Sequence, residues 1–170
     1  MLFLKEANFE NIEKEYLFVR DMPLDENGFE NQWFGISREE FEEKALKIMI
    51  ANAKGDLLPD SFVPQTYFFL WNDDEIVGQF RIRHFLNESL RNGAGHIGYF
   101  IAKEYRGRGY GTEGLRLTLK IAKAIVPEEE IYLRVNKNNR ASLMVMLHNG
   151  GYIYKQDRGS YYVRIKKQIS

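Results

Sequence analysis

The chain has 170 residues, of which 44% are hydrophobic and 28% are charged, a composition typical of a globular protein. Lys plus Arg and Asp plus Glu number 24 each, which argues against a general nucleic-acid binder, because such proteins carry a basic excess. The sequence contains no cysteine, which excludes disulfides, thiolate catalysis and cysteine-ligated metals. Its three histidines lack the spacing of metal ligands, so no metal site is expected.

The sequence also carries no sign of a membrane or export segment. No apolar run approaches the roughly 20 residues that span a bilayer, and the first residues lack the basic and apolar parts of a secretory leader. We therefore expect a cytoplasmic protein of one domain, residues 1–170, with neither a membrane nor a nucleic acid as its partner.

The first third of the chain predicts one strand and two helices. Residues 2–7 are predicted to form a short strand, and residues 8–22 carry apolar side chains at helical spacing. A loop is expected at residues 23–36. Ser37 begins an S-x-x-E capping box, which predicts a helix that continues to Gly55.

The middle of the chain changes to the alternating period of strands. Three strands are predicted, the first two joined by the turn NDDE: residues 66–71, 76–85 and 96–102. Alternation places Arg81 and Arg83 on one face of the second strand, and Phe80, Ile82 and His84 on the other. The loop LNESLRNGAG leads to the third strand.

The last third of the chain predicts two helices and three further strands. The elements expected are a helix at 112–126, a strand at 131–135, a helix at 141–148, and a hairpin of strands 152–156 and 161–167. Pro127 stops the first of these helices. The whole order, β-α-α-β-β-β-α-β-α-β-β, predicts an α/β fold with one mixed sheet.

The segment YRGRGYGTEG, residues 105–114, is the most informative motif. Gly109, Gly111 and Gly114 match the dinucleotide pattern G-x-G-x-x-G, but charged residues separate them from the preceding strand, and the next strand ends in Asn136 rather than an acid. A P-loop would need Lys-Ser or Lys-Thr after the glycines. A tight turn that merely starts a helix is the third alternative.

A fourth reading uses the spacing R-x-x-G-x-G. Glycines let successive backbone N–H groups turn toward one anion, and a helix that begins near Thr112 adds unpaired N–H groups and a positive dipole end. Arg106 and Arg108 add positive charge around that point. The segment therefore suits a pyrophosphate.

At this point the sequence resembles the GNAT N-acetyltransferase superfamily, in particular a bacterial subset of predicted acetyltransferases. R-x-x-G-x-G between a strand and a long helix is similar to the family's acyl-CoA pyrophosphate loop, and VNKNNRASLMVMLHNGGY is similar to its N-x-A-S helix start and closing glycine turn. The order of elements also matches over most of the chain. The resemblance implies a central, mostly antiparallel sheet with a splayed parallel strand pair, flanked by helices.

The resemblance also implies acetyl-CoA as cosubstrate and a set of residues that hold it. The pantetheine arm would pair with the splayed strand, the pyrophosphate with the glycine loop, and the end of the next strand would steady both. The residues carried over are Phe100, Ile101, Ala102, Arg106, Gly107, Arg108, Gly109, Tyr110, Gly111, Thr112, Asn136, Asn139 and Ser142. Core packing of the strand, solvation of the two arginine side chains, and local turns or caps at the asparagines and Ser142 are the alternatives.

The catalytic groups are less clear from the sequence. Many members of the family carry a tyrosine that protonates the leaving thiolate, and the matching position here is Val145. His96, at the start of the cleft strand, is a candidate base because imidazole titrates near neutral pH. Tyr99, on the same strand, is a candidate acid, and Glu88, in the preceding loop, is a candidate base. Each of the three has a purely structural alternative.

The resemblance implies transfer of an acetyl group from acetyl-CoA to a primary amine by direct attack, because an acetyl-cysteine intermediate cannot form without cysteine. The alternative is a CoA-binding module that has lost catalysis and acts as a sensor or interaction partner. The acceptor, a small molecule or a peptide amine, is not readable from the sequence, and ENQWFG and LNESLRNGAG are candidate walls of its pocket. A homodimer is possible in this family.

Overall fold

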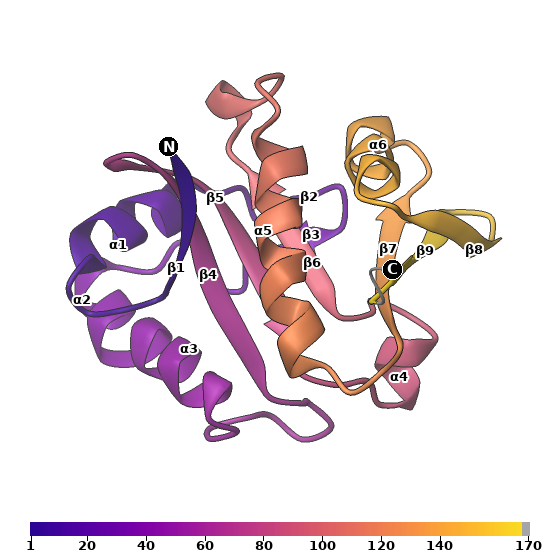
Figure 1. Ribbon diagram of the computed structural model, residues 1–170. Coiled ribbons are helices and arrows are strands. Elements are labelled where there is room, and N and C mark those ends of the chain that lie inside the picture. Colours follow the sequence, from indigo (N-terminus) through magenta and orange to yellow (C-terminus); the bar gives the residue numbers. More distant parts are fainter. Residues whose placement is uncertain (168–170) are drawn as a thin grey trace.

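The computed structural model describes residues 1–167 and arranges them as two main antiparallel sheets with helices packed around them (Figure 1). The strands are β1 (Leu2–Glu6), β2 (Asp25–Glu26), β3 (Phe29–Glu30), β4 (Gln65–Asn72), β5 (Glu75–Arg83), β6 (Ile97–Ile101), β7 (Glu130–Asn136), β8 (Tyr152–Gln156) and β9 (Ser160–Lys166). The helices are α1 (Ile12–Asp21), α2 (Arg38–Glu40), α3 (Leu46–Ala53), α4 (Glu88–Arg91), α5 (Tyr110–Ile125) and α6 (Arg140–His148). A π-helical turn at Phe41–Ala45 joins α2 to α3, and a short 3₁₀ turn at Lys103–Tyr105 follows β6.

The larger sheet has the order β1-β4-β5-β6, and the smaller one has the order β7-β9-β8. All pairs in both sheets are antiparallel, with Phe68 opposite Phe80 and Phe80 opposite Tyr99 in the larger sheet. This mixed fold, with an antiparallel sheet flanked by helices, confirms the fold class expected from the sequence.

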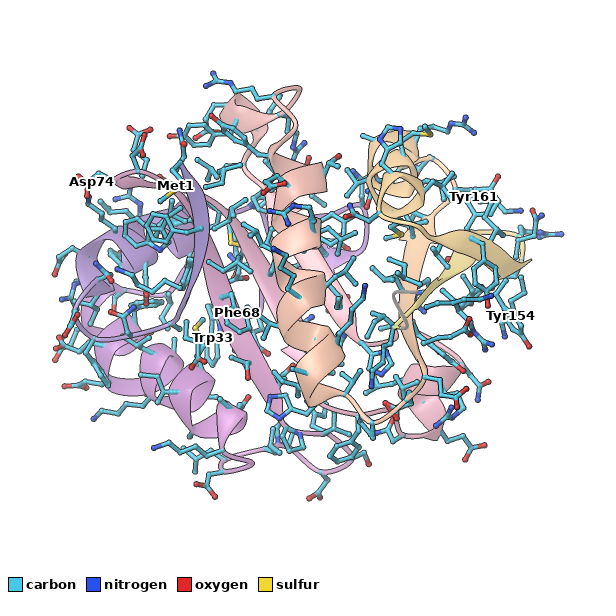
Figure 2. All side chains as sticks on the ribbon, viewed as in Figure 1. Met1, Trp33, Phe68, Asp74, Tyr154 and Tyr161 are labelled. Carbon is cyan, nitrogen blue, oxygen red and sulfur yellow. The ribbon has the colours of Figure 1, made fainter. Side chains whose placement is uncertain are left out.

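Two apolar cores lie on opposite faces of the larger sheet. Phe68 and Phe80 pack against Leu115 of α5 on one face, and Phe69 packs with Met49 of α3 on the other. Figure 2 shows labelled members of each layer: Phe68 on β4, and Trp33, which packs against the core on the α3 side. Because β4 is covered on both faces, it reads as the continuous apolar run YFFLW rather than as an alternating strand.

Within residues 1–167, backbone hydrogen bonds join the two sheets only where β6 and β7 begin to separate. His96 N–H donates to the Tyr132 carbonyl over 2.7 Å, and Gly95 forms an isolated bridge with Leu133. A Cβ on Gly95 would lie 2.2 Å from the Tyr132 carbonyl oxygen, so only glycine permits this approach. Because α5 returns the chain, β6 and β7 run in the same direction (Figure 1), and no ladder joins them along the rest of their described length.

Several expected boundaries and loops differ from the structure. The loop predicted at 23–36 contains the small hairpin β2–β3, and the loop predicted at 86–95 contains α4. Helix α5 begins at Tyr110 rather than at Thr112, because Gly109 precedes it in a left-handed conformation. The β2–β3 hairpin and α4 are too short to give a periodic pattern in the sequence.

None of the helices within residues 1–167 combines the length and the apolar composition needed to cross a bilayer. In the same part of the chain, no cluster of three or more His, Cys, Asp or Glu side chains is placed to hold a metal ion.

Candidate active site

The glycine loop after β6 adopts a conformation that exposes its backbone. Gly107 and Gly109 have φ of +76° and +79°, in the left-handed region that other residues rarely adopt. No atom lies within 4 Å of the position where either glycine would carry a Cβ. Glycine is therefore favoured at these two positions by the left-handed backbone conformation, and not by close packing against a neighbour.

The backbone N–H groups of residues 107–112 have no acceptor within the described part of the chain. Helix α5 begins at Tyr110 without a side-chain cap, and its first backbone bond runs from Glu113 N–H to the Gly109 carbonyl. A row of unpaired N–H groups at the positive end of a 16-residue helix is an anion site. The residues present thus fit a pyrophosphate.

A cleft of about 420 Å³ opens in front of this loop. Its walls come from β6, the loop, the start of α5, the start of α6 and the β2–β3 hairpin. The lining residues are Glu26, Asn27, Phe29, Tyr99, Phe100, Ile101, Tyr105, Arg106, Gly107, Gly109, Tyr110, Gly111, Thr112, Asn139, Ala141, Ser142 and Val145. The cleft therefore collects most of the residues that the sequence predicted for CoA.

The open edge of β6 is set by the alternation of its hydrogen bonds. Ala102 N–H donates to Val77 of β5 over 3.0 Å, and Arg83 N–H of β5 donates to the His96 carbonyl over 2.7 Å. In an antiparallel ladder the intervening residues, among them Tyr99 and Ile101, point their backbone groups to the other side. The expectation for the backbone of Phe100 and Ala102 is therefore wrong: their polar groups face β5, and Tyr99 and Ile101 face the gap.

Arg106 and Arg108 serve structure rather than phosphate in this conformation. Arg106 donates to the Ile101 carbonyl over 2.9 Å and to Glu26 over 2.6 Å, and its guanidinium lies over the Phe100 ring. This guanidinium holds the pKa of Glu26 below its usual range through the hydrogen bond. Arg108 donates to the Glu104 carbonyl over 3.3 Å and is exposed. Of the two side chains, only that of Arg106 lines the cleft.

Tyr99 and Ser142 meet across the cleft. Their hydroxyl oxygens lie 2.5 Å apart, and Tyr99 also donates to the Ser142 carbonyl over 3.1 Å. The Tyr99 ring stacks on Phe80 with 5.2 Å between centroids, which fixes its direction. Burial raises the pKa of the Tyr99 phenol well above its usual value, opposed by the hydrogen bond to Ser142. The phenol is therefore protonated at neutral pH.

The residues singled out at the end of β7 and on α6 already have contacts within the protein. Asn139 caps α6, with its amide oxygen accepting from Ser142 N–H over 3.2 Å. Asn136 borders Gly28 of the β2–β3 turn, with its amide nitrogen 3.3 Å from the ideal Gly28 Cβ position. Val145 lies against Gly111, 3.2 Å from the ideal Cβ position there. A valine side chain thus stands at the position where the family's tyrosine was expected.

His96 lies outside the cleft and is fully buried. Its Nδ1 accepts from Tyr132 N–H over 2.9 Å, so Nε2 carries the proton and donates to Glu128 over 2.8 Å. Burial lowers the pKa of the imidazole, opposed by the hydrogen bond to Glu128. Since neither nitrogen faces the cleft, the expectation of a catalytic base does not fit this side chain. His96 instead joins the two sheets where they meet.

Glu88 is also set apart from the cleft. It is exposed in the first turn of α4, whose N-cap is Asn87. It is absent from the lining of the cleft. The expectation of a base at Glu88 therefore does not fit its position either, and of the three catalytic candidates only Tyr99 reaches the cleft.

The family follows from a direct comparison of the sequence. Residues 26–151 match the family model described as "Acetyltransferase (GNAT) domain". The chain belongs to the GNAT acetyltransferase family. Family membership confirms the expected activity class, transfer of an acetyl group from acetyl-CoA to an amine. Among curated protein sequences, none matches this chain.

Solved GNAT structures share the fold over nearly the whole chain. The Campylobacter jejuni N-acetyltransferase PseH in complex with acetyl coenzyme A is 21% identical with a TM-score of 0.60, covering 99% of this chain and 100% of that chain. Spermidine N-acetyltransferase from Vibrio cholerae in complex with CoA and spermine is 16% identical with a TM-score of 0.64, covering 98% and 95%. The ribosomal L7/L12 alpha-N-protein acetyltransferase RimL in complex with CoA is 15% identical with a TM-score of 0.67, covering 98% and 94%.

The structure of this GNAT domain also adds residues that sequence reasoning missed. Phe29 of the β2–β3 hairpin packs on Phe100 with 5.7 Å between centroids, and Glu26 of the same hairpin is tied to Arg106. Asn149 donates to the Thr112 carbonyl over 3.1 Å and to the Val145 carbonyl over 2.9 Å, which fixes the start of α5 against α6. The NGG motif contained Asn149, but only the fold gives it these partners.

Proposed function

We propose that this GNAT domain transfers the acetyl group of acetyl-CoA directly to a primary amine within a ternary complex. Acetyl-CoA supplies the acetyl group as an activated thioester. The rest of the chemistry is assigned below to groups of this chain. We treat residues 1–170 as one functional unit, because the cleft takes its walls from elements far apart in the sequence, from the β2–β3 hairpin to α6.

The backbone of residues 107–112 holds the pyrophosphate of the cosubstrate. Its unpaired N–H groups and the positive end of α5 supply the charge, and the glycines leave room for the approach. The backbone of Tyr99 and the N–H group of Ile101 face the pantetheine arm at the free edge of β6, while the Ile101 carbonyl accepts from Arg106. Asn139 and Ser142 border the same cleft on α6.

Tyr99 donates the proton that the departing thiolate needs. Tyr99 lines the cleft, burial keeps its phenol protonated, and its hydroxyl oxygen lies 2.5 Å from that of Ser142. This assignment places the acid on β6, because the position on α6 is occupied by Val145.

The acceptor amine gives its proton to water. Glu26 is the one carboxylate among the described residues that lines the cleft, and it is engaged with Arg106. Direct attack is the remaining route, because the sequence holds no cysteine that could form an acetyl-cysteine intermediate.

The unpaired N–H groups of the glycine loop carry this proposal, and Gly109→Val tests them. We expect CoA affinity, measured by calorimetry, to fall at least about tenfold, because a branched side chain at positive φ distorts the loop and crowds the phosphate. Gly35→Val is the matched control, since Gly35 also has positive φ, +76°, with no atom within 4 Å of its Cβ position.

Turnover is measured in parallel as release of free thiol from acetyl-CoA with a panel of amines. Equal CoA affinity in wild type and in Gly109→Val would contradict the loop assignment. Tight CoA binding without thiol release for any amine would instead favour the alternative, a CoA-binding module without catalysis. Val145 supports this alternative, because it stands where the family commonly has a tyrosine acid.

A further inference from the structure

A second, smaller hollow of about 100 Å³ adjoins the cleft. It shares Phe29, Tyr99, Asn139 and Ser142 with the cleft, so these side chains stand between the two spaces. Its other walls come from β5, the segment before β6, and β7. None of residues 105–112 lines it, so it lies away from the groups that hold the phosphates of CoA.

The hollow is lined by three arginines. Arg81 and Arg83 come from β5, on the face opposite Phe80 and Ile82, and Arg134 comes from β7. No carboxylate of the described chain lines the hollow. Within residues 1–167, these three guanidinium groups also take part in none of the ion pairs.

Arg81 is directed over β6 by its surroundings. Its guanidinium lies over the Tyr67 ring at 5.8 Å, and its Nη2 is 3.6 Å from the ideal Cβ position of Gly98. The glycine opposite Arg81 in the ladder thus leaves space for the guanidinium. The Nε of Arg81 is buried without a hydrogen-bond partner among the described residues, which is costly unless a ligand supplies one.

Arg83 and Arg134 complete the positive charge. Arg83 donates to the Gly95 carbonyl over 3.1 Å, a bond that holds its side chain beside the start of β6. Burial, together with the charges of Arg81 and Arg134, lowers the pKa of Arg83 to about 9, so it remains a cation at neutral pH. Gathering three like charges without an anion is unfavourable, and a bound anion would relieve it.

We propose that the acceptor amine carries an anionic group, a carboxylate or a phosphate, which Arg81, Arg83 and Arg134 bind in this hollow. Two guanidinium forks on one strand face suit the bidentate geometry of either group. The amine then lies in the cleft beside Tyr99, and acceptors with a second cationic group are repelled. This inference rests on the proposed function, because it names the class of acceptor for the same site.

The test compares amines that differ only in their distal group. We would measure kcat/KM by thiol release for glycine, β-alanine and 4-aminobutyrate, and for ethylamine, propylamine and butylamine as uncharged partners of matched length. Aminoethyl phosphate distinguishes phosphate from carboxylate, and putrescine supplies the cationic end. We expect the anionic acceptors to be preferred over their alkylamine partners by roughly 10- to 100-fold, as for charge-assisted hydrogen bonds.

Variants then assign that preference to the arginines. Arg81→Gln and the exposed Arg134→Gln should reduce the preference, the ratio of kcat/KM for an anionic acceptor to that for its alkylamine partner, about tenfold or more. Arg116→Gln is the matched control, because Arg116 is paired with Glu113 on α5, away from both hollows. A second readout needs no turnover: calorimetry of the CoA-saturated protein with N-acetyl-β-alanine, which should bind, and with N-propylacetamide, which should not.

The outcomes separate the two proposals. Turnover of alkylamines or putrescine as fast as of the acids, or a preference unchanged in Arg81→Gln, would overturn the anionic acceptor and leave the acetyltransferase proposal intact. Absence of thiol release with every amine would overturn the acetyltransferase proposal, and binding of N-acetyl-β-alanine that Arg81→Gln weakens would still support the anion site. Failure of both readouts would overturn the anion site as well.

Discussion

At the scale of single residues, Tyr99 is the side chain on which the proposed chemistry depends. Its ring is held by Phe80, its hydroxyl by Ser142, and its pKa is raised by burial. A phenol in these surroundings remains protonated beyond pH 10, its ordinary pKa, and suits a proton donor rather than a base. The proposed donor lies on β6 rather than on α6, unlike the pattern that the sequence resembles.

We expect Tyr99→Phe to lower kcat by roughly 10²- to 10⁴-fold, the usual contribution of a positioned acid. The stacking on Phe80 is retained, so CoA affinity and the folding free energy should change little. Tyr152→Phe is the control, because that hydroxyl binds Glu130 at the edge of the smaller sheet. A Tyr99→Phe enzyme with wild-type kcat would show that water protonates the thiolate.

At the scale of elements, the decisive feature is the junction where β6 and β7 meet and then separate. Gly95 allows the close approach, and His96 bonds to Tyr132 twice, through its backbone N–H and through its ring. Glu128, just before β7, accepts a hydrogen bond from the other ring nitrogen. These contacts hold the closed end of the gap, so the open end can accept a ligand.

His96→Ala should therefore act on stability. We expect the free energy of unfolding to fall by about 2–4 kcal/mol, because Tyr132 N–H and Glu128 lose their partner in a buried place and a cavity remains. Urea unfolding measures this, with the exposed His148→Ala as control. A fully stable His96→Ala variant with kcat lowered 100-fold or more would instead restore His96 as the base.

At the scale of the whole molecule, the free energy of unfolding depends on pH through groups whose pKa differs between the folded and the unfolded state. Glu15 is fully buried in α1 and accepts from the backbone N–H of Asn8 over 3.0 Å. Burial raises the pKa of Glu15 to about 8, opposed by that hydrogen bond. The folded state thus binds a proton that the unfolded chain releases near pH 4.5.

This difference in proton binding makes the free energy of unfolding fall as the pH rises. Stability from protonated Glu15 is fully present below pH 4.5 and is lost as the pH rises toward about 8, by an amount on the order of 5 kcal/mol. Urea unfolding between pH 5 and pH 8 should show this loss in the wild type and little of it in Glu15→Gln. The exposed Glu10→Gln serves as control. An equal slope in wild type and Glu15→Gln would contradict the assignment.

The sequence by itself determined the order of the main elements, the family and the glycine loop for which we propose pyrophosphate binding. Those features are local: helical and alternating periods, and glycines at fixed spacing, act through backbone geometry that neighbours in the sequence define. The same locality explains why Arg81 and Arg83 could be placed on one face of their strand.

Only the tertiary structure decided which candidates share a space. His96 and Tyr99 lie three positions apart on or beside one strand, yet His96 is buried at the junction and Tyr99 reaches the cleft. Arg134 meets Arg81 and Arg83 only because β7 returns beside β6 after α5. Burial, hydrogen-bond partners and the gathering of like charges depend on contacts between residues distant in sequence, and no local pattern encodes them.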